Sequence, residues 1–508
     1  MSGRTMARVV LALGAVLSAL LTCSLPASAH IDFESSTPAD GDVLVAPVSE
    51  IIVRFTGEAT PAGDEFLVLD PSRGVREPDS VTTVDGTEYV LGFDPPLTGG
   101  VVGVRWVVAA PDAHPIDGSF SFMVDAPAPI TVPASAVPTT VPSTTATAPT
   151  TEPLTAATTS DAATPMTPAG GSASISLEEF LTSEPDLPGQ GRQLAGRVAG
   201  LLGAVLGVGV LAFLTSAFRG ARSEMSVGLM AVAVAGVVTV LGAGLEYSGW
   251  LAQSSGSLLG GFAAAPGSGA GLRMLGGVVL AGSAFTAVRA VPNGTRATRA
   301  LSASVTDQAV GKPSATSGIA ERQFRWDGRS APAALVGAAL LVVSFSFDGH
   351  TVTEGPRLLH VLVNAVHVTA GAVWVGGVTS FAGLLVMRRR HGVSGRAGSL
   401  ILRFSGIATV ALGAVVAAGG AMAWMVLDSF GELTSTEWGR VLLLKSAAVG
   451  LAALGGAYNH FRLRPRLEAA PDDAGTEAEL QSYLIAEGIV LVFVVVATAW
   501  LVVASAST

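Results

Sequence analysis

Two side chains that can bind a metal ion lie close together in one short stretch of the chain, Asp112 and His114. They form an Asp-x-His pair between two strand-like runs, with Pro111 and Pro115 beside them. A carboxylate oxygen and an imidazole nitrogen can coordinate the same divalent metal. Two ligands are too few for a tight site, so a third must come from elsewhere in the chain.

The third candidate ligand is His30. Ala27-Ser28-Ala29 before it has the small-x-small form that signal peptidase cuts, and an apolar run follows Arg8. We expect residues 1–29 to be a secretory signal, and cleavage after Ala29 would give His30 a free α-amine beside its imidazole. A rival lipobox at residues 20–23 would lipidate Cys23 and leave His30 internal, but threonine before the cysteine fits that poorly.

The composition is that of a membrane protein. Of 508 residues, 49% are hydrophobic and 13% are charged, and there are 61 glycines. The net charge is −10, with the acids crowded in the first 130 residues, which does not favour nucleic acid as a partner. Cys23 is the single cysteine, so a mature chain starting at His30 would form no disulfide.

Residues 30–125 predict an extracytoplasmic all-β domain. Short β-rich runs at 50–55, 65–69, 88–91, 101–108 and 119–124 are separated by turn residues, without a helical period. This pattern is typical of a Greek-key sandwich or small barrel. Residues 126–190 are rich in Pro, Thr, Ala and Ser, and we expect them to be a flexible linker.

Residues 191–508 predict an all-α transmembrane bundle of eight helices. The apolar runs lie near 194–218, 225–247, 271–291, 332–347, 358–387, 402–427, 438–461 and 483–504, and the fourth is short. Arginines crowd the loops after the first, third, fifth and seventh runs, whereas Arg357 is the single arginine of the other loops. The positive-inside rule therefore predicts a multi-pass plasma-membrane protein with its N-terminal domain outside the cell.

The β-domain resembles the CopC family of copper-resistance proteins. The marks are His30, the Thr37-Pro38-Ala39-Asp40-Gly41 turn, Trp106, and residues 112–115 running into Gly118-Ser119-Phe120-Ser121-Phe122. The resemblance implies Cu(II) held by the amine and imidazole of His30, with Asp112 and His114 completing the site. Nitrogen and oxygen ligands with an amine also suit tetragonal Cu(II), which has the highest affinity in the divalent series.

The helical part resembles the CopD family, so the chain is similar to CopC–CopD fusions for copper transport. This resemblance is more diffuse. It rests on Gly349-His350, Leu359-His360, Trp374-Val375-Gly376-Gly377, Phe404-Ser405-Gly406, Trp438-Gly439-Arg440, Leu444-Lys445, Asn459 and Glu487.

Polar residues in the fifth expected helix are candidates for a copper path. His360, Asn364 and His367 stand at i, i+4 and i+7, which is one helix face. Polar groups in a span are costly and usually face a bundle interior or a water-filled path. We interpret them as a descending ladder of copper ligands that starts near His350. The alternative is that Asn364 and His367 only make hydrogen bonds between helices.

Five further residues complete the candidate set. Met422 and Met425 near the outer end of the sixth helix are thioethers suited to Cu(I), although such methionines more often fill cores. Lys445 and Glu487, in the seventh and eighth helices, either pair with each other or assist proton coupling. Glu246, near the outer end of the second helix, either guards the entrance or simply lies at the interface.

These observations predict a membrane protein that captures Cu(II) outside the cell membrane and moves copper inward, with Cu(I) in the membrane domain. We expect copper ions, the lipid bilayer and an extracytoplasmic copper chaperone or reductase as partners. The chain has no P-loop and no Asp-Lys-Thr-Gly motif, which disfavours ATP-driven pumping, and we expect no enzymatic activity.

Two other functions are open. One is a copper or haem redox protein, because an N-terminal histidine with a second histidine also occurs in copper oxygenases. Against it, Asp112 would fill a position that oxygen chemistry needs, and His360 and His367 share one helix instead of facing across two. The other is a sensor or buffer that binds copper without transport, although polar residues within the spans argue against a mere anchor.

Overall fold

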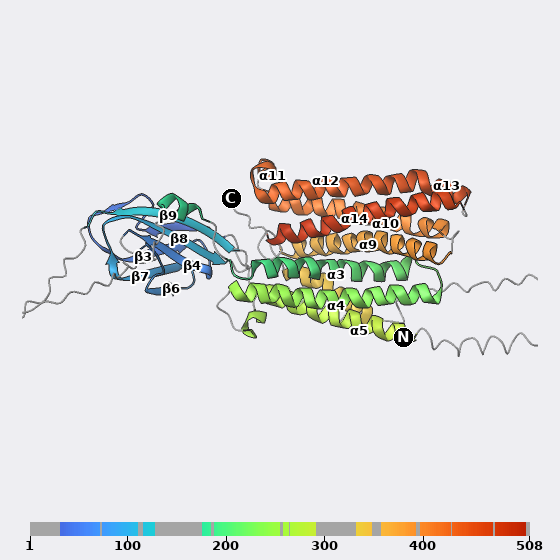
Figure 1. Ribbon diagram of the computed structural model, residues 1–508, viewed down its shortest axis with the longest axis horizontal. Coiled ribbons are helices and arrows are strands. Elements are labelled where there is room, and N and C mark those ends of the chain that lie inside the picture. The colour runs from blue at the N-terminus through green and yellow to red at the C-terminus, as the bar shows by residue number, and fades with distance from the viewer. Residues whose placement is uncertain are drawn as a thin grey trace, which may run out of the picture.

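The computed structural model describes residues 31–71, 74–109, 115–126, 175–183, 187–253, 258–263, 265–290, 332–347, 357–392, 397–427, 429–470 and 473–503. They form a β-domain followed by a helical domain (Figure 1). His30, Asp112, His114 and His350 lie outside these residues.

The β-domain is a sandwich of two sheets, which confirms the predicted all-β fold. Its described strands are β1 (Phe33–Thr37), β2 (Val43–Leu44), β3 (Val48–Phe55), β4 (Thr60–Asp70), β5 (Gly74–Arg76), β6 (Ser80–Val84), β7 (Glu88–Leu97), β8 (Gly100–Ala109) and β9 (Pro115–Val124). One sheet has the order β1-β3-β7-β6 and the other β2-β9-β8-β4-β5. The five predicted runs are β3, β4, β7, β8 and β9, and the four strands not predicted are shorter.

Alternating apolar residues of both sheets build the core of the sandwich. In β3, Ile51, Val53 and Phe55 point inward and are almost fully buried, as expected for a strand with one solvated face. Trp106 of β8 packs edge-on against Phe55, with ring centroids 5.0 Å apart. The residue opposite Trp106 must be small, because a Cβ on Gly118 would lie 2.4 Å from the indole Cζ2.

The helical domain contains seven described helices that are long and apolar enough to cross a membrane. They are α3 (Gln190–Ser216), α4 (Arg222–Gln253), α5 (Ala265–Ala290), α9 (Arg357–Arg390), α10 (Ala397–Val426), α12 (Glu437–Tyr458) and α14 (Ala474–Val503). The expected fourth span is shorter, α7 (Pro332–Ser344) continuing into the 3-10 turn η4 (Phe345–Phe347). The predicted count of eight is therefore close, and the protein is a multi-pass membrane protein.

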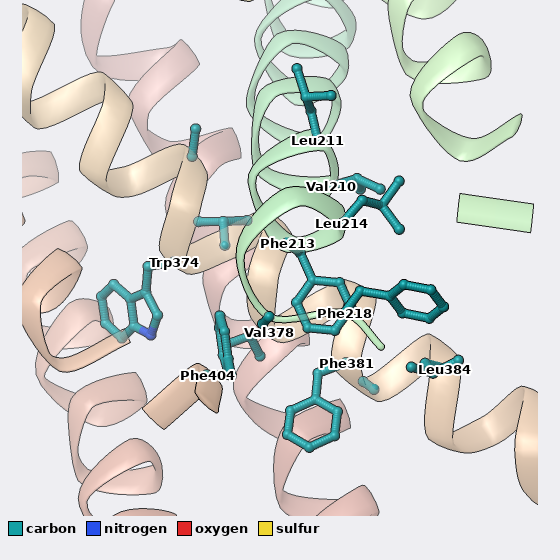
Figure 2. Packing of buried hydrophobic residues seen from close by; sticks show 14 of the residues in the cluster. Val210, Leu211, Phe213, Leu214, Phe218, Trp374, Val378, Phe381, Leu384 and Phe404 are labelled. Atoms are coloured by element: carbon teal, nitrogen blue, oxygen red, sulfur yellow. The ribbon is translucent and has the colours of Figure 1, made fainter. Parts of the chain in front are cut away.

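Helix α3 lies at the centre of the bundle and packs on α4, α9 and α14. Small residues let it approach its neighbours closely, because a Cβ on Gly242 of α4 would lie 2.2 Å from the backbone nitrogen of Gly200. At the other end of α3, Phe213 contacts Phe381 of α9 and Phe404 of α10, with ring centroids 6.3 and 5.8 Å away (Figure 2). The apolar core therefore joins the first, fifth and sixth expected spans.

The arginines of the predicted inner loops gather at one end of the bundle. Arg403 of α10 donates to the Ala217 carbonyl at the end of α3 (3.2 Å), and Arg388 at the end of α9 binds Glu224 at the start of α4 (2.7 and 3.0 Å). We call this the arginine-rich end; its described members are Arg219, Arg222, Arg289, Arg388, Arg389, Arg390, Arg403, Arg462, Arg464 and Arg466.

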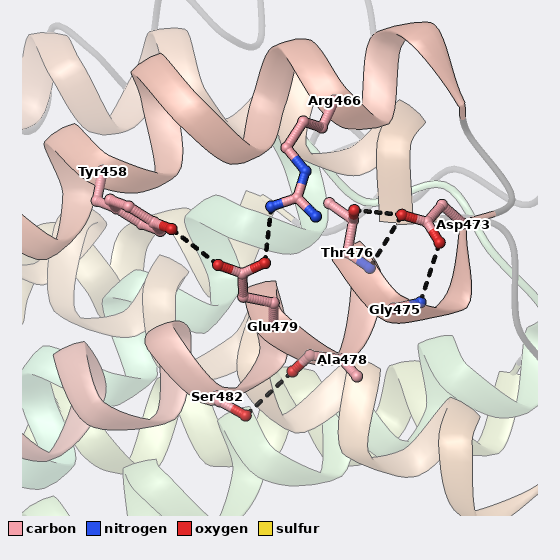
Figure 3. A network of polar contacts seen from close by, with 8 residues as sticks. All are labelled: Tyr458, Arg466, Asp473, Gly475, Thr476, Ala478, Glu479 and Ser482. Carbon is pink, nitrogen blue, oxygen red and sulfur yellow. Dashed lines mark hydrogen bonds and ion pairs between the residues drawn. The ribbon is translucent and has the colours of Figure 1, made fainter.

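Polar contacts close the turn between α12 and α14 at the arginine-rich end. After α12 the chain forms a π-helical turn, η5 (Asn459–Leu463), and a short helix, α13 (Arg464–Ala469). Glu479 of α14 accepts from the Tyr458 hydroxyl and from Arg466, both at 2.8 Å (Figure 3).

Three short elements remain. Helix α2 (Leu177–Thr182) precedes α3 and packs on β8 and β9, η1 (Gly260–Ala263) precedes α5, and α11 (Glu432–Ser435) precedes α12. Helix α2 lies inside the segment expected to be a linker.

Candidate functional site

The residues that flank the candidate outer metal site lie together at one end of the sandwich. Strands β8 and β9 pair as far as Ala109 and Pro115, so residues 110–114 join them at a hairpin end. Ala109 also pairs with Thr60 at the start of β4. The chain enters beside this end, since Thr56 just before β4 donates to the Asp32 carbonyl (3.0 Å). The connections to His30 and to the Asp112–His114 loop therefore leave the sandwich at the same end.

Three polar side chains expected on one face of the fifth span lie in α9. His360 is 1% exposed and Asn364 is 8% exposed, so neither faces lipid. Asn364 donates through Nδ2 to the Phe345 carbonyl of η4 (2.9 Å). Hydrogen bonding between structural elements, the alternative role expected for Asn364, is therefore present.

His367 is oriented by a backbone carbonyl of α10. Its Nδ1 lies 3.1 Å from the Val415 oxygen. A carbonyl only accepts, so Nδ1 carries the proton in a neutral ring and Nε2 keeps its lone pair. Ligating histidines commonly donate their other ring nitrogen in this way. A Cβ on Gly419, one turn along α10, would lie 3.1 Å from the His367 Cε1, so the ring fits against a glycine.

Three other candidates lie on α10 and α12, the helices that carry Val415 and Lys445. Met422 stands seven residues after Val415 on α10, within about 20° of the same helix face, whereas Met425 is turned about 80° away. Both are partly buried. Lys445 of α12 lies within electrostatic range of His367. Lys445 is therefore associated with His367. Met422 shares the helix face of Val415 but lies about 10 Å further along α10, and Met425 is turned away from that face.

Glu487 does not pair with Lys445, so the first of the two alternatives given for these residues is not realised. Its carboxylate accepts from the Trp374 indole Nε1 of α9 and from Asn459 Nδ2 of η5, both at 3.1 Å. Among the described residues no ion pair joins Glu487 to a basic group. Two neutral donors hold this 5% exposed carboxyl. Lys445 lies 14 residues before Asn459, which is about 21 Å along the helix axis, so it is too far along α12 to reach Glu487.

A cavity of about 210 Å³ lies beside Glu487, between α9, α10, α12, α14 and the η5 turn. It is mostly apolar, with polar groups from Ser405, Asn459, His460 and Glu487. Asn459 Oδ1 is buried and, within the described part of the chain, has no hydrogen-bond partner. His460 Nδ1 lies 2.7 Å from the Ser405 hydroxyl, which fixes the ring in the cavity wall. Short π-helical segments such as η5 occur often at functional sites.

Glu246 lies in a buried cluster of charges. Arg197 of α3 binds its Oε1 (2.6 Å) and Arg273 of α5 binds its Oε2 (2.9 Å). Arg273 is 1% exposed. Neither role predicted for Glu246, guarding the entrance or lying at the interface, includes these ion pairs. Its carboxylate ties three helices together near the end opposite the arginine-rich end.

In the described ranges, no three His, Cys, Asp or Glu side chains gather closely enough to hold a metal ion. The polar groups are instead spread along the bundle. His360, His367 and Trp374 stand seven residues apart on one face of α9, and Trp374 leads to Glu487 and the cavity. Sequence reasoning did not assign a role to His460, and its place next to Asn459 was the available signal.

Two protein families match the chain. The CopC domain matches residues 33–125, and Copper resistance protein D (CopD) matches residues 399–501. The CopD match includes Met422, Lys445, His460 and Glu487, whereas α9 lies before it.

Curated relatives of the β-domain are copper-resistance proteins. The chain is 31% identical over 117 residues to Copper resistance protein C of Xanthomonas campestris pv. juglandis, covering 22% of this chain and 91% of that protein. It is 33% identical over 128 residues to Copper resistance protein C of Pseudomonas syringae pv. tomato, covering 24% and 96%. It is 28% identical over 123 residues to Copper transport protein CutJ of Bacillus subtilis, but covers only 23% of that protein.

Two solved structures also match the β-domain. CopC from Methylosinus trichosporium OB3b is 23% identical, with 19% of this chain and 95% of that chain covered and a TM-score of 0.17. PcoC from Escherichia coli, a methionine-rich copper resistance protein, is 26% identical, with 19% and 99% covered and a TM-score of 0.17.

The fold and these matches define a class: a copper-resistance protein that joins a β-sandwich to a multi-pass membrane domain. The chain belongs to the CopC family of copper-resistance proteins, and it carries a CopD domain in the same polypeptide.

Proposed function

We propose that this protein captures Cu(II) with its β-domain outside the cell and carries copper inward through the helical domain. The arginine-rich end is then cytoplasmic, as the positive-inside rule requires. The observation that supports transport is the polar face of α9. There His367 holds its proton on Nδ1, so its Nε2 lone pair can bind a metal ion. Polar groups along a span are costly, so their continuation to Glu487 supports a path.

Capture is assigned to His30, Asp112 and His114 binding Cu(II). Supporting this, the connections to these residues leave the sandwich at one end. An amine, two imidazoles and a carboxylate make a nitrogen and oxygen set that suits tetragonal Cu(II). Cleavage after Ala29 supplies the amine.

Passage is assigned to His360, Asn364 and His367, with Met422 supplying a soft ligand to Cu(I) at the level of the α9 ladder. His350 is the entry ligand, and Met425 is a weaker candidate because it points further from His367. Lys445 and Glu487 serve charge and proton coupling. Loss of a proton from Glu487 would leave a carboxylate charge that offsets a cation moving past, and return of the proton would restore the neutral site. Asn459 Nδ2 donates to this carboxyl group.

Copper is cargo here, so we assign no enzymatic reaction to the chain. A chaperone outside the cell or a reductase that makes Cu(I) would be a partner upstream of the path.

The test is copper accumulation in cells that lack the protein, measured by mass spectrometry after complementation. Wild type should raise cellular copper, and the double variant His360→Ala and His367→Ala should return it to background. Variants His30→Ala and His114→Ala should lose only part of the gain, because they slow capture. The matched control is His391→Ala, an exposed histidine just beyond α9, which should behave as wild type.

Transport would be refuted if all these variants accumulated copper to the same level. Persistent Cu(II) binding at the cell surface in that case would support a buffer or sensor.

A further inference from the structure

Helix α2 packs tightly on the β-domain only a few residues before the first membrane helix. It is the short green helix beside β9 in Figure 1. Phe180 is 1% exposed, and with Leu177 it covers Gly103 of β8. A Cβ on Gly103 would lie 2.9 Å from Leu177 Cδ1 and 3.0 Å from Phe180 Cδ1. The helix therefore needs a glycine beneath it.

Polar contacts fix the C-terminal half of α2 on the same sheet. The Ser119 hydroxyl of β9 donates to the Leu181 carbonyl at 3.1 Å. Arg105 of β8 donates to the Ser183 hydroxyl, and its guanidinium lies 5.5 Å from the centre of the Phe180 ring. The Ser176 hydroxyl caps the first turn by accepting from the Glu179 nitrogen (3.2 Å).

We infer that α2 is the anchor that holds the β-domain beside the membrane domain, and that residues 127–174 do not set this distance. Between Ser183 and Gln190 the chain advances seven residues, which reach at most about 25 Å. If the β-domain were joined only through the 66 residues from Val124 to Gln190, the root-mean-square separation would be roughly 45 Å. The root-mean-square span of seven residues is roughly 15 Å, so docking of α2 shortens the expected separation about threefold.

The direction of α2 also decides which end of the sandwich faces the membrane helices. Leu177 and Phe180 lie over Gly103, which pairs with Ser121, whereas the end of α2 contacts Arg105 and its partner Ser119. The pair Arg105–Ser119 lies nearer than the pair Gly103–Ser121 to the end of the hairpin that Ala109 and Pro115 form. The chain therefore leaves α2 toward the hairpin end, on the route to α3. This inference does not depend on copper transport.

The experiment measures the distance between spin labels on the full chain in lipid nanodiscs. Labels are placed at Thr82→Cys on β6 and Gly191→Cys on α3, both exposed, in a Cys23→Ser background. We expect one narrow distance distribution. A flexible insertion of about 20 residues after Thr150 should leave it unchanged, whereas the same insertion after Pro185 should broaden it about twofold.

Two variants remove the anchor from opposite sides. Phe180→Asp introduces a charge at the buried contact, and Gly103→Val fills the space under α2 while keeping a strand-forming residue. Both should broaden the distribution about twofold and make it sensitive to the insertion after Thr150. Glu178→Gln, on the exposed side of α2, is the control and should match the parent. The inference is overturned if the insertion after Thr150 broadens the parent distribution, or if both anchor variants leave it narrow.

Discussion

Removing the charge of Glu246 should destabilise the helical domain strongly. Its carboxylate binds Arg197 at 2.6 Å and Arg273 at 2.9 Å, and Arg273 is 1% exposed. Arginine does not lose its proton in proteins, so Glu246→Gln removes the negative charge that both guanidinium groups bind. Breaking a buried ion pair in this way costs about 3–5 kcal/mol. At about 2–4 °C per kcal/mol for a large domain, the midpoint should fall by roughly 6–20 °C.

The assay is thermal unfolding of the purified full chain in one detergent at one heating rate. The matched control is Glu468→Gln, which removes a surface carboxylate that is 43% exposed and 2.8 Å from Arg464. An exposed i, i+4 pair contributes about 0.3–0.5 kcal/mol, so this control should shift the midpoint by only about 1–2 °C. Equal shifts for the two variants would refute the conclusion that the Glu246 cluster depends on charge pairing in a dry environment.

Three other predictions concern single contacts. Gly118→Ala should cost about 1–3 kcal/mol, seen as faster hydrogen exchange in β8 and β9, because its Cβ would meet Trp106 at 2.4 Å. Gly419→Val should lower copper accumulation as His367→Ala does, because the Cβ alone would lie 3.1 Å from that ring, while the protein still folds. Hydrogen bonds from Thr476 and the Gly475 nitrogen hold the pKa of Asp473 below its ordinary 3.8. Its stabilisation should be present above that pH and disappear as pH falls through the lower folded value, so Asp473→Asn should lower the unfolding midpoint at pH 6, and this difference should shrink as the pH falls below 3.8.

The β-domain was predictable because its pattern is local. Buried residues alternate along β3, and β8 is apolar over most of its length, so the sequence pattern alone identifies both as strands. β6 is exposed at every position and owes its strand to pairing with β7, which no local pattern reveals. The membrane spans were predictable for the same reason, since bilayer thickness imposes their length.

The contacts of the charged residues were not predictable, because they depend on which helix faces which. Lys445 and Glu487 looked like partners by charge, yet Glu487 meets Trp374 and Asn459. Arg197 and Arg273 lie at the starts of two apolar runs, and nothing in the sequence pattern predicted that they bind Glu246. Helix α2 has only six residues, too few for a periodic signal, and it owes its stability to packing on Gly103.

The spacing of the polar groups in the helical domain suits passage better than storage. His360, His367 and the contact of Trp374 with Glu487 are separated by about 10 Å each along α9, so a cation would meet one imidazole, then another, and then one carboxylate. Conduction requires binding that is strong enough for entry and weak enough for release, which a series of sparse stations provides. A closed three-ligand set would hold copper tightly and stop it. Such a set is proposed only in the β-domain, where capture from dilute solution needs high affinity, and release there must precede entry into the ladder.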